Sequence, residues 1–183
     1  MQHVPLHLNL NLVLDPGFSA FSKTISGGYS PPMELSGKVV LVTGAARRVG
    51  KAIATELSRA GARIVVHHHN SSKEAEELVQ ALGNACAIRA DLAEPAGVQA
   101  LFAEARRFGG GIDVLVNSAA SFARKPFEEI ADAEWEGVLG LNLLAPARCA
   151  REAAKDMRRR GAGVIVNILD VGAFVPWRNY AHH

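Results

Sequence analysis

The residues best placed to do chemistry lie where an apolar run meets two glycines, in the segment Val39-Val40-Leu41-Val42-Thr43-Gly44-Ala45-Ala46-Arg47-Arg48-Val49-Gly50. Gly44 lets a strand turn tightly into a helix because glycine has no Cβ. The helix that follows presents free N–H groups and the positive end of its dipole to the turn, which suits a pyrophosphate. The segment therefore indicates dinucleotide binding. Because Arg48 stands where the usual fingerprint has its middle glycine, a turn without a ligand also fits the segment.

The expected second strand ends in the polar run His67-His68-His69-Asn70-Ser71-Ser72. A cofactor with a free ribose 2′-hydroxyl usually meets an acidic residue at this place, and the run contains none. Histidine, asparagine, serine and the nearby Arg48 instead offer hydrogen-bond donors to a phosphate, which favours NADP(H) over NAD(H). A metal site is the rival interpretation of the consecutive histidines, but successive side chains of a strand point to opposite faces. We therefore predict no metal.

Small and polar residues follow the next two expected strands. Asp91, which precedes Leu92, either accepts a hydrogen bond from an adenine amino group or holds a turn at the start of a helix. Asn117, Ser118 and Ala119 end the fourth strand, where small residues let the backbone approach a flat ligand. Both groups are predicted to border the cofactor, because ligands of open α/β sheets bind beyond the carboxyl ends of the strands.

Four further residues are candidates for substrate contact or catalysis. Ser121 and Phe122 come after the fourth strand, and the Phe122 ring either stacks on a flat substrate or packs under a loop. Asn142 is a polar amide on the apolar face of a long expected helix, where it structures an active site or satisfies a backbone group. Asp170 places a carboxylate after the fifth strand, where ligand chemistry is expected.

The elements that must position these residues alternate regularly along the chain. Apolar runs predict strands at 39–43, 63–68, 86–90, 112–117 and 163–168, and helical spacing predicts helices at 48–60, 73–82, 95–107 and 133–159. Such alternation is typical of an α/β fold with a Rossmann-type doubly wound parallel sheet, three layers deep in α/β/α order. We therefore expect a single dinucleotide-binding domain.

Composition narrows the class of protein. The chain has 183 residues, 49% of them hydrophobic and 21% charged, and a formal net charge of +2, too small to argue for a nucleic-acid partner. No apolar run is long enough to span a membrane, and Cys86 and Cys149 have no paired spacing. We expect a cytoplasmic protein that acts on a small molecule. Residues 1–36 are predicted to be a flexible extension, and 37–183 the domain.

Taken together, the motifs resemble the short-chain dehydrogenase/reductase family over residues 34–183. The marks are Thr43-Gly44-x3-Arg48-x-Gly50, Asp91-Leu92, Asn117-Ser118-Ala119 and Asn142-Leu143-Leu144-Ala145-Pro146. Arg48, the histidine-rich strand end, Phe122 and Leu169-Asp170 are most similar to the pteridine reductases. The resemblance implies a cofactor site made of Thr43, Gly44, Arg48, Val49, Gly50, His67, His69, Asn70, Ser71, Asp91, Leu92, Asn117, Ser118 and Ala119.

The resemblance also implies a reaction. The family transfers hydride from NADP(H) or NAD(H) to a carbonyl or imine, here one such as a pterin. A tyrosine gives the proton, a lysine four residues on lowers its pKa, and an asparagine, here Asn142, anchors a water relay. In pteridine reductases an aspartate, here Asp170, assists, and the tyrosine lies thirteen residues later, where this chain has His183.

The family's lysine and last elements would lie beyond His183. We therefore expect a C-terminally truncated chain, a sheet incomplete on that side and doubtful turnover. The catalytic candidates are then Asp170, Asn142 and His183. A homo-oligomer is implied for the full-length family. A nucleotide-binding module, or a truncated product without turnover, is the alternative function.

Overall fold

The computed structural model describes residues 34–170 and 177–182, so most of the expected extension (1–36) and the catalytic candidate His183 lie outside the described residues. Within them Leu35 already packs against the core, and the Gly37 N–H donates to the Gly61 carbonyl at 2.9 Å. The described part of the domain is therefore anchored from Leu35 onward.

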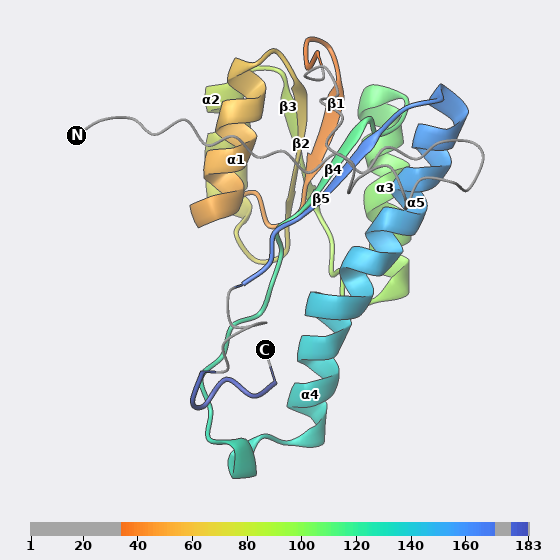
Figure 1. The fold of residues 1–183 in the computed structure, drawn as a ribbon. Coiled ribbons are helices and arrows are strands. Elements are labelled where there is room, and N and C mark those ends of the chain that lie inside the picture. The colour runs from red at the N-terminus through yellow and green to blue at the C-terminus, as the bar shows by residue number, and fades with distance from the viewer. Residues whose placement is uncertain (1–33, 171–176, 183) are drawn as a thin grey trace, which may run out of the picture.

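The centre of the fold is a five-stranded parallel sheet in the order β3-β2-β1-β4-β5 (Figure 1). The strands are β1 (Val39–Val42), β2 (Arg63–His68), β3 (Ala85–Arg89), β4 (Val114–Asn117) and β5 (Val164–Asn167). The chain builds outward from β1 in one direction through β2 and β3, and in the other through β4 and β5. That reversal places a crevice at the carboxyl ends of β1 and β4, and the predicted Rossmann-type class is confirmed.

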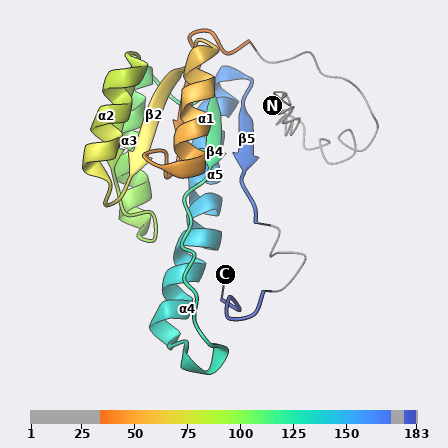
Figure 2. The ribbon, with the colours of Figure 1, turned by 90° about the vertical axis from the view of Figure 1, so that its left-hand side faces the viewer.

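Helices cover both faces of the sheet (Figures 1 and 2). One face carries α1 (Arg48–Arg59) and α2 (Ser72–Leu82), and the other carries α3 (Pro95–Gly109) and α5 (Ala145–Arg160). Successive side chains of a strand point to opposite faces of the sheet. In β1, Val40 and Val42 join the core on the α1/α2 side, whereas Val39 and Leu41 join the core on the α3/α5 side. The period of two in the strands thus produces two separate cores.

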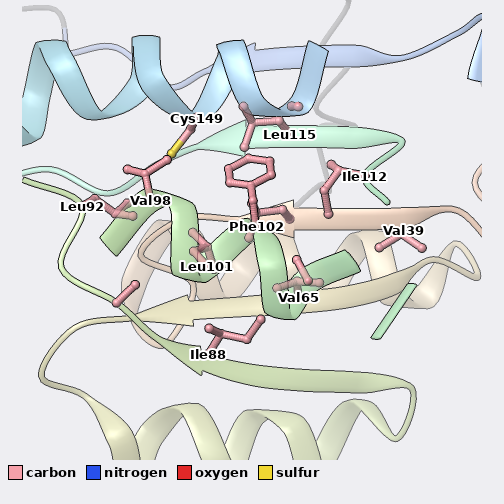
Figure 3. Close-up of a cluster of buried hydrophobic side chains, with 14 of the residues drawn as sticks. Val39, Val65, Ile88, Leu92, Val98, Leu101, Phe102, Ile112, Leu115 and Cys149 are labelled. Atoms are coloured by element: carbon pink, nitrogen blue, oxygen red, sulfur yellow. The ribbon is translucent and has the colours of Figure 1, made fainter. Parts of the chain in front are cut away.

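The core on the α3/α5 side is built around Phe102, which is fully buried (Figure 3). Phe102 of α3 points toward Leu115 of β4, and Leu101 of α3 and Cys149 of α5 belong to the same cluster. Burial raises the pKa of the Cys149 thiol to about 12 and that of Cys86 to about 11. Both thiols are therefore protonated and act as small core groups.

The expected long helix over 133–159 is wrong in one respect. The structure divides it into α4 (Asp132–Leu139), a π-helical segment η2 (Gly140–Leu144) and α5, and a short 3-10 helix η1 (Phe127–Glu129) precedes it. Helical spacing cannot reveal a single wider turn, because the apolar face continues on both sides of it. All other predicted ends lie within two residues of the observed ones.

Two features of the described residues bear on the class of protein. None of their helices combines the length and the apolar character that crossing a bilayer requires. Nor do histidine, cysteine and carboxylate side chains of this part of the chain gather into a group able to hold a metal ion.

Candidate functional site

A cleft of about 600 Å³ opens at the carboxyl ends of β1, β2, β3 and β4. Most of the predicted cofactor residues lie on it, from segments far apart in the sequence. The walls are Gly44, Ala46, Arg47, Arg48, Val49, Gly50, His67, His68, His69, Asn70, Ser71, Ala90, Asp91, Leu92, Ser118, Ala119, Ala120, Ser121, Phe122 and Leu141. Its size and its position outside the strand ends suit a dinucleotide.

The two predicted glycines are required by close backbone approach. Gly44 has φ +65°, and a Cβ there would lie 3.0 Å from the Cα of Ala119. A Cβ on Gly50 would overlap the carbonyl group of Gly44. A side chain at Gly44 would push the turn away from the loop after β4, and one at Gly50 would push the start of α1 away from the turn before it, so both positions exclude larger residues.

Arg48 occupies the place of the missing middle glycine and adopts φ +50°. A side chain in this left-handed region costs about 1 kcal/mol or more relative to glycine. The Arg48 side chain is exposed and borders the cleft at the first turn of α1. Strain of this kind concentrates at functional sites, and here the strained residue borders the same cleft as the end of β2.

His67 differs from its predicted role as a phosphate donor. The Gly44 N–H donates to its Nδ1 at 3.0 Å, and its Nε2 lies 3.1 Å from the Ala90 carbonyl oxygen. Its ring is buried, and burial lowers the pKa of His67 to about 4. Because backbone groups occupy both ring nitrogens, His67 shapes the cleft and offers it no donor.

His69 and Asp91 lie on the exposed rim of the cleft. The His69 Nε2 is 3.9 Å from Asp91 Oδ2, and both side chains are about half exposed. The other carboxylate oxygen, Oδ1, accepts from the Ala93 N–H at 3.0 Å. Of the two roles predicted for Asp91, the structure shows the one in which its carboxylate holds a turn. Its second oxygen, Oδ2, lies on the side of His69.

Asn70 and Ser71 complete the end of β2. Both line the cleft, and Ser71 precedes the first residue of α2. The Ser71 hydroxyl does not cap that helix. Asn70 and Ser71 border the same cleft as Arg48, and all three side chains offer hydrogen-bond donors suited to an anion.

Thr43 was predicted to bind cofactor, but it braces the site. Its buried Oγ1 accepts from the Ser118 N–H at 2.9 Å and from the Ala119 N–H at 3.0 Å. The same hydroxyl donates to the Val116 carbonyl at 3.4 Å. Thr43 is not one of the described residues that border the cleft. It joins the ends of β1 and β4 and so aligns two walls of the cleft.

Replacing Thr43 with valine is expected to lower the free energy of unfolding by about 1–3 kcal/mol, because valine keeps the shape but leaves the Ser118 and Ala119 amides without an acceptor. Urea unfolding followed by circular dichroism measures the change. Thr43→Ser keeps the oxygen and is the matched control, expected to stay near wild type. Equal stability of the valine variant would show that these bonds contribute nothing.

Asn117, another predicted cofactor residue, likewise braces the sheet. Its Nδ2 donates to Asn167 Oδ1 at 2.9 Å and to the Pro146 carbonyl at 3.4 Å. These bonds tie the ends of β4 and β5 to the start of α5. Asn117 is buried, and it does not belong to the described residues that border the cleft.

Asn142 lies in the π-helical segment and holds the loop after β4. Its Oδ1 accepts from the Ser121 N–H at 2.8 Å, and its Nδ2 donates to the Ser121 carbonyl at 3.0 Å. Of the two roles predicted for Asn142, the structure shows the one in which its amide forms hydrogen bonds with backbone groups, here those of Ser121. The same segment directs Leu141 to the cleft, so the wider turn serves two contacts at once.

Phe122 borders the cleft and also contacts residues near the end of the chain. Its ring stacks on Tyr180 with centroids 4.5 Å apart and meets Trp177 edge-on at 6.1 Å. The Lys125 N–H donates to the Asn179 carbonyl at 2.8 Å, so residues 177–182 lie alongside the loop that follows Phe122. The ring thus packs against a loop, one of the two predicted arrangements, while 47% of the residue is exposed.

Asp170 is exposed and follows β5 by three residues. Its side chain does not border the cleft formed by the described residues. Of the three catalytic candidates, Asn142 and Asp170 do not border this cleft, and His183 lies outside the described residues. Of the residues predicted to bind the cofactor, all but Thr43 and Asn117 border the same cleft.

Several lining residues were not predicted from the sequence. The larger ones are Arg47, His68 and Leu141, and the smaller ones are Ala46, Ala90 and Ala120. Arg47 Nη1 lies 4.0 Å from Glu74 Oε1 at the rim. Its position beside Arg48 was a usable signal. Leu141 had none, because its direction depends on the π-helical turn.

Comparison with known proteins agrees with this geometry. The sequence profile of the family described as short chain dehydrogenase matches residues 38–182. A hydroxynaphthalene reductase-like protein Arp2 of Metarhizium robertsii is 37% identical over 140 residues, covering 74% of this chain and 52% of the relative. An NADPH-dependent aldehyde reductase 2, chloroplastic, of Arabidopsis thaliana is 37% identical over 155 residues, covering 75% and 57%.

A third relative, a short-chain type dehydrogenase/reductase of Picea abies, is 34% identical over 158 residues, covering 80% of this chain and 58% of the relative. The chain spans about half the length of the curated relatives it matches.

Proposed function

Because this chain belongs to the short-chain dehydrogenase family, we propose that its cleft binds NADP(H) in preference to NAD(H). The observation that carries the proposal is the set of side chains at the end of β2. Arg48, Asn70 and Ser71 border the cleft there, and no carboxylate occupies the strand end itself. A 2′-phosphate would gain charge-assisted hydrogen bonds from these donors, whereas a bare ribose hydroxyl would not meet its usual acceptor.

The pyrophosphate is assigned to the turn between β1 and α1. The first amides of α1 have no partner within the helix, and Gly44 and Gly50 let the backbone come close. Ser118 and Ala119 would border the nicotinamide half, and Asp91 with Leu92 the adenine. The bound cofactor supplies the hydride, and these residues bind and orient it.

For the whole protein we propose reduction of a carbonyl or imine compound. One relative's name refers to an aldehyde and another's to a hydroxynaphthalene. The similarity of Arg48, Phe122 and Asp170 to pteridine reductases favours a flat substrate such as a pterin. Ser121 and Phe122 would contact it, with Asn142, Asp170 and His183 nearest the proton transfer. A cytoplasmic homo-oligomer completes this proposal.

Titration with NADPH and NADH tests the cofactor choice directly. We expect NADPH to bind at least several-fold more tightly, measured by the change in nicotinamide fluorescence or by calorimetry. Equal affinities would contradict the assignment of the 2′-phosphate site. Binding of neither dinucleotide would contradict the proposed function itself. Tight binding without oxidation of NADPH by aldehydes or dihydropterin would favour a nucleotide-binding module.

A further inference from the structure

One side chain joins three segments of the cofactor cleft. His67, on β2, accepts the Gly44 N–H of the turn after β1 on its Nδ1 at 3.0 Å. Its Nε2 lies 3.1 Å from the carbonyl oxygen of Ala90, which follows β3. His67 is 3% exposed, so its ring is largely shielded from water. An acceptor at Nδ1 and a donor at Nε2 define a single neutral tautomer.

The backbone of the same residue holds the next amide of the turn. The Ala45 N–H donates to the His67 carbonyl at 2.9 Å. His67 therefore engages two consecutive amides, those of Gly44 and Ala45, and turns both toward β2. The Arg48, Val49 and Gly50 amides, which begin α1, have no partner four residues earlier within the helix and so remain for an anion.

From this geometry we propose that His67 is a positioning residue that selects which amides of the turn face the cofactor's pyrophosphate. The inference rests on the proposed cofactor function. Without the ring, the Gly44 amide has no acceptor at Nδ1 and can rotate toward the cleft. The phosphate-binding turn would then lose its fixed shape. An aliphatic residue would also leave the Ala90 carbonyl buried without this donor.

The role requires a neutral ring. A protonated imidazole carries N–H groups on both nitrogens, and its Nδ1–H would then face the Gly44 N–H. The titratable groups that act on the ring are His68 and His69, at and just after the end of its own strand, and Asp91 after β3. The arginines 47 and 48, at the start of α1, border the same cleft. Only Asp91 among them favours the protonated form.

Three variants separate positioning from packing. His67→Leu removes both bonds, His67→Asn keeps an acceptor near the Nδ1 position, and Ile88→Val trims the residue paired with His67 in β3. With NADP⁺ as the probe at neutral pH, we expect affinity to fall about tenfold or more in the leucine variant, equivalent to losing about one buried hydrogen bond. The asparagine variant should recover most of it. Ile88→Val should lose stability and keep its affinity.

A measurement on the cofactor-free wild-type chain tests the bond itself. We expect a scalar coupling between the Gly44 amide nitrogen and His67 Nδ1 in an NMR spectrum of the ¹⁵N-labelled protein, with Nε2 carrying the proton. Absence of the coupling, or wild-type affinity in a folded leucine variant, would overturn the role of His67. Failure of the wild-type chain to bind NADP⁺ would instead overturn the proposed function, and the coupling would still report on His67.

Discussion

Replacing Arg48 with alanine is expected to weaken NADPH binding by about ten- to a hundredfold while leaving NADH binding nearly unchanged. A hydrogen bond to a charged group contributes about 1.5–3 kcal/mol, and NADH has no 2′-phosphate to lose it. Arg48 is exposed at the cleft, so its removal leaves no cavity in the core. Parallel titrations with the two dinucleotides measure the ratio of affinities.

Arg48→Gly is the matched variant, because it removes the same guanidinium and also relieves the backbone. Its NADPH affinity should fall as in the alanine variant. Its free energy of unfolding should exceed that of the alanine variant by about 1 kcal/mol, since φ +50° suits glycine. An equal loss of NADPH and NADH affinity in both variants would show that Arg48 shapes the turn and does not bind the phosphate.

Acid is expected to destabilise the protein through His67. Burial holds the folded-state pKa of His67 at about 4, below its ordinary value of 6.5. Between these values the unfolded chain binds a proton that the folded chain does not. The stabilising contribution is therefore complete above pH 6.5 and is lost as the pH falls to about 4, for a total of about 3 kcal/mol. Urea unfolding at a series of pH values measures it.

Carboxylates also titrate near the lower end of this range, so the comparison with His67→Asn is decisive. The asparagine variant does not titrate, and its stability should depend less on pH, by about 3 kcal/mol over the same interval. Its stability below pH 4 should approach that of the wild type. Parallel curves for the two proteins across pH 4–7 would contradict the lowered pKa.

Much of the fold could be predicted because its signals are local. Apolar runs gave each strand, helical spacing gave α1, α2 and α3, and alternation of the two gave the parallel sheet. The carboxyl ends of the strands then indicated the cleft, and Gly44, Gly50 and Arg48 lie on it as expected. The positions of these residues depend on the direction of the strands and on the turn between β1 and α1, and both can be predicted from nearby residues.

The roles of the bracing residues could not be predicted, because they depend on partners distant in sequence. Thr43 bonds to amides that are 75 and 76 residues away along the chain. The sequence run of histidines does not distinguish His67 from His69, and only the packed structure shows that the first is buried and the second half exposed. Phe122 and Tyr180 likewise meet only through the folded chain.

The π-helical segment Gly140–Leu144 has a consequence for insertions and deletions. A π turn holds about one residue more than an α turn, so deleting one residue there would restore a regular helix and leave no break in the chain. The deletion would rotate α4 by about 100° relative to α5. Trp135 would leave its edge-on contact with His182, now 5.8 Å between ring centroids, while the sheet stayed intact. The one extra residue of the π turn thus fixes the rotation of α4 relative to α5. A substitution that keeps the chain length does not change that rotation.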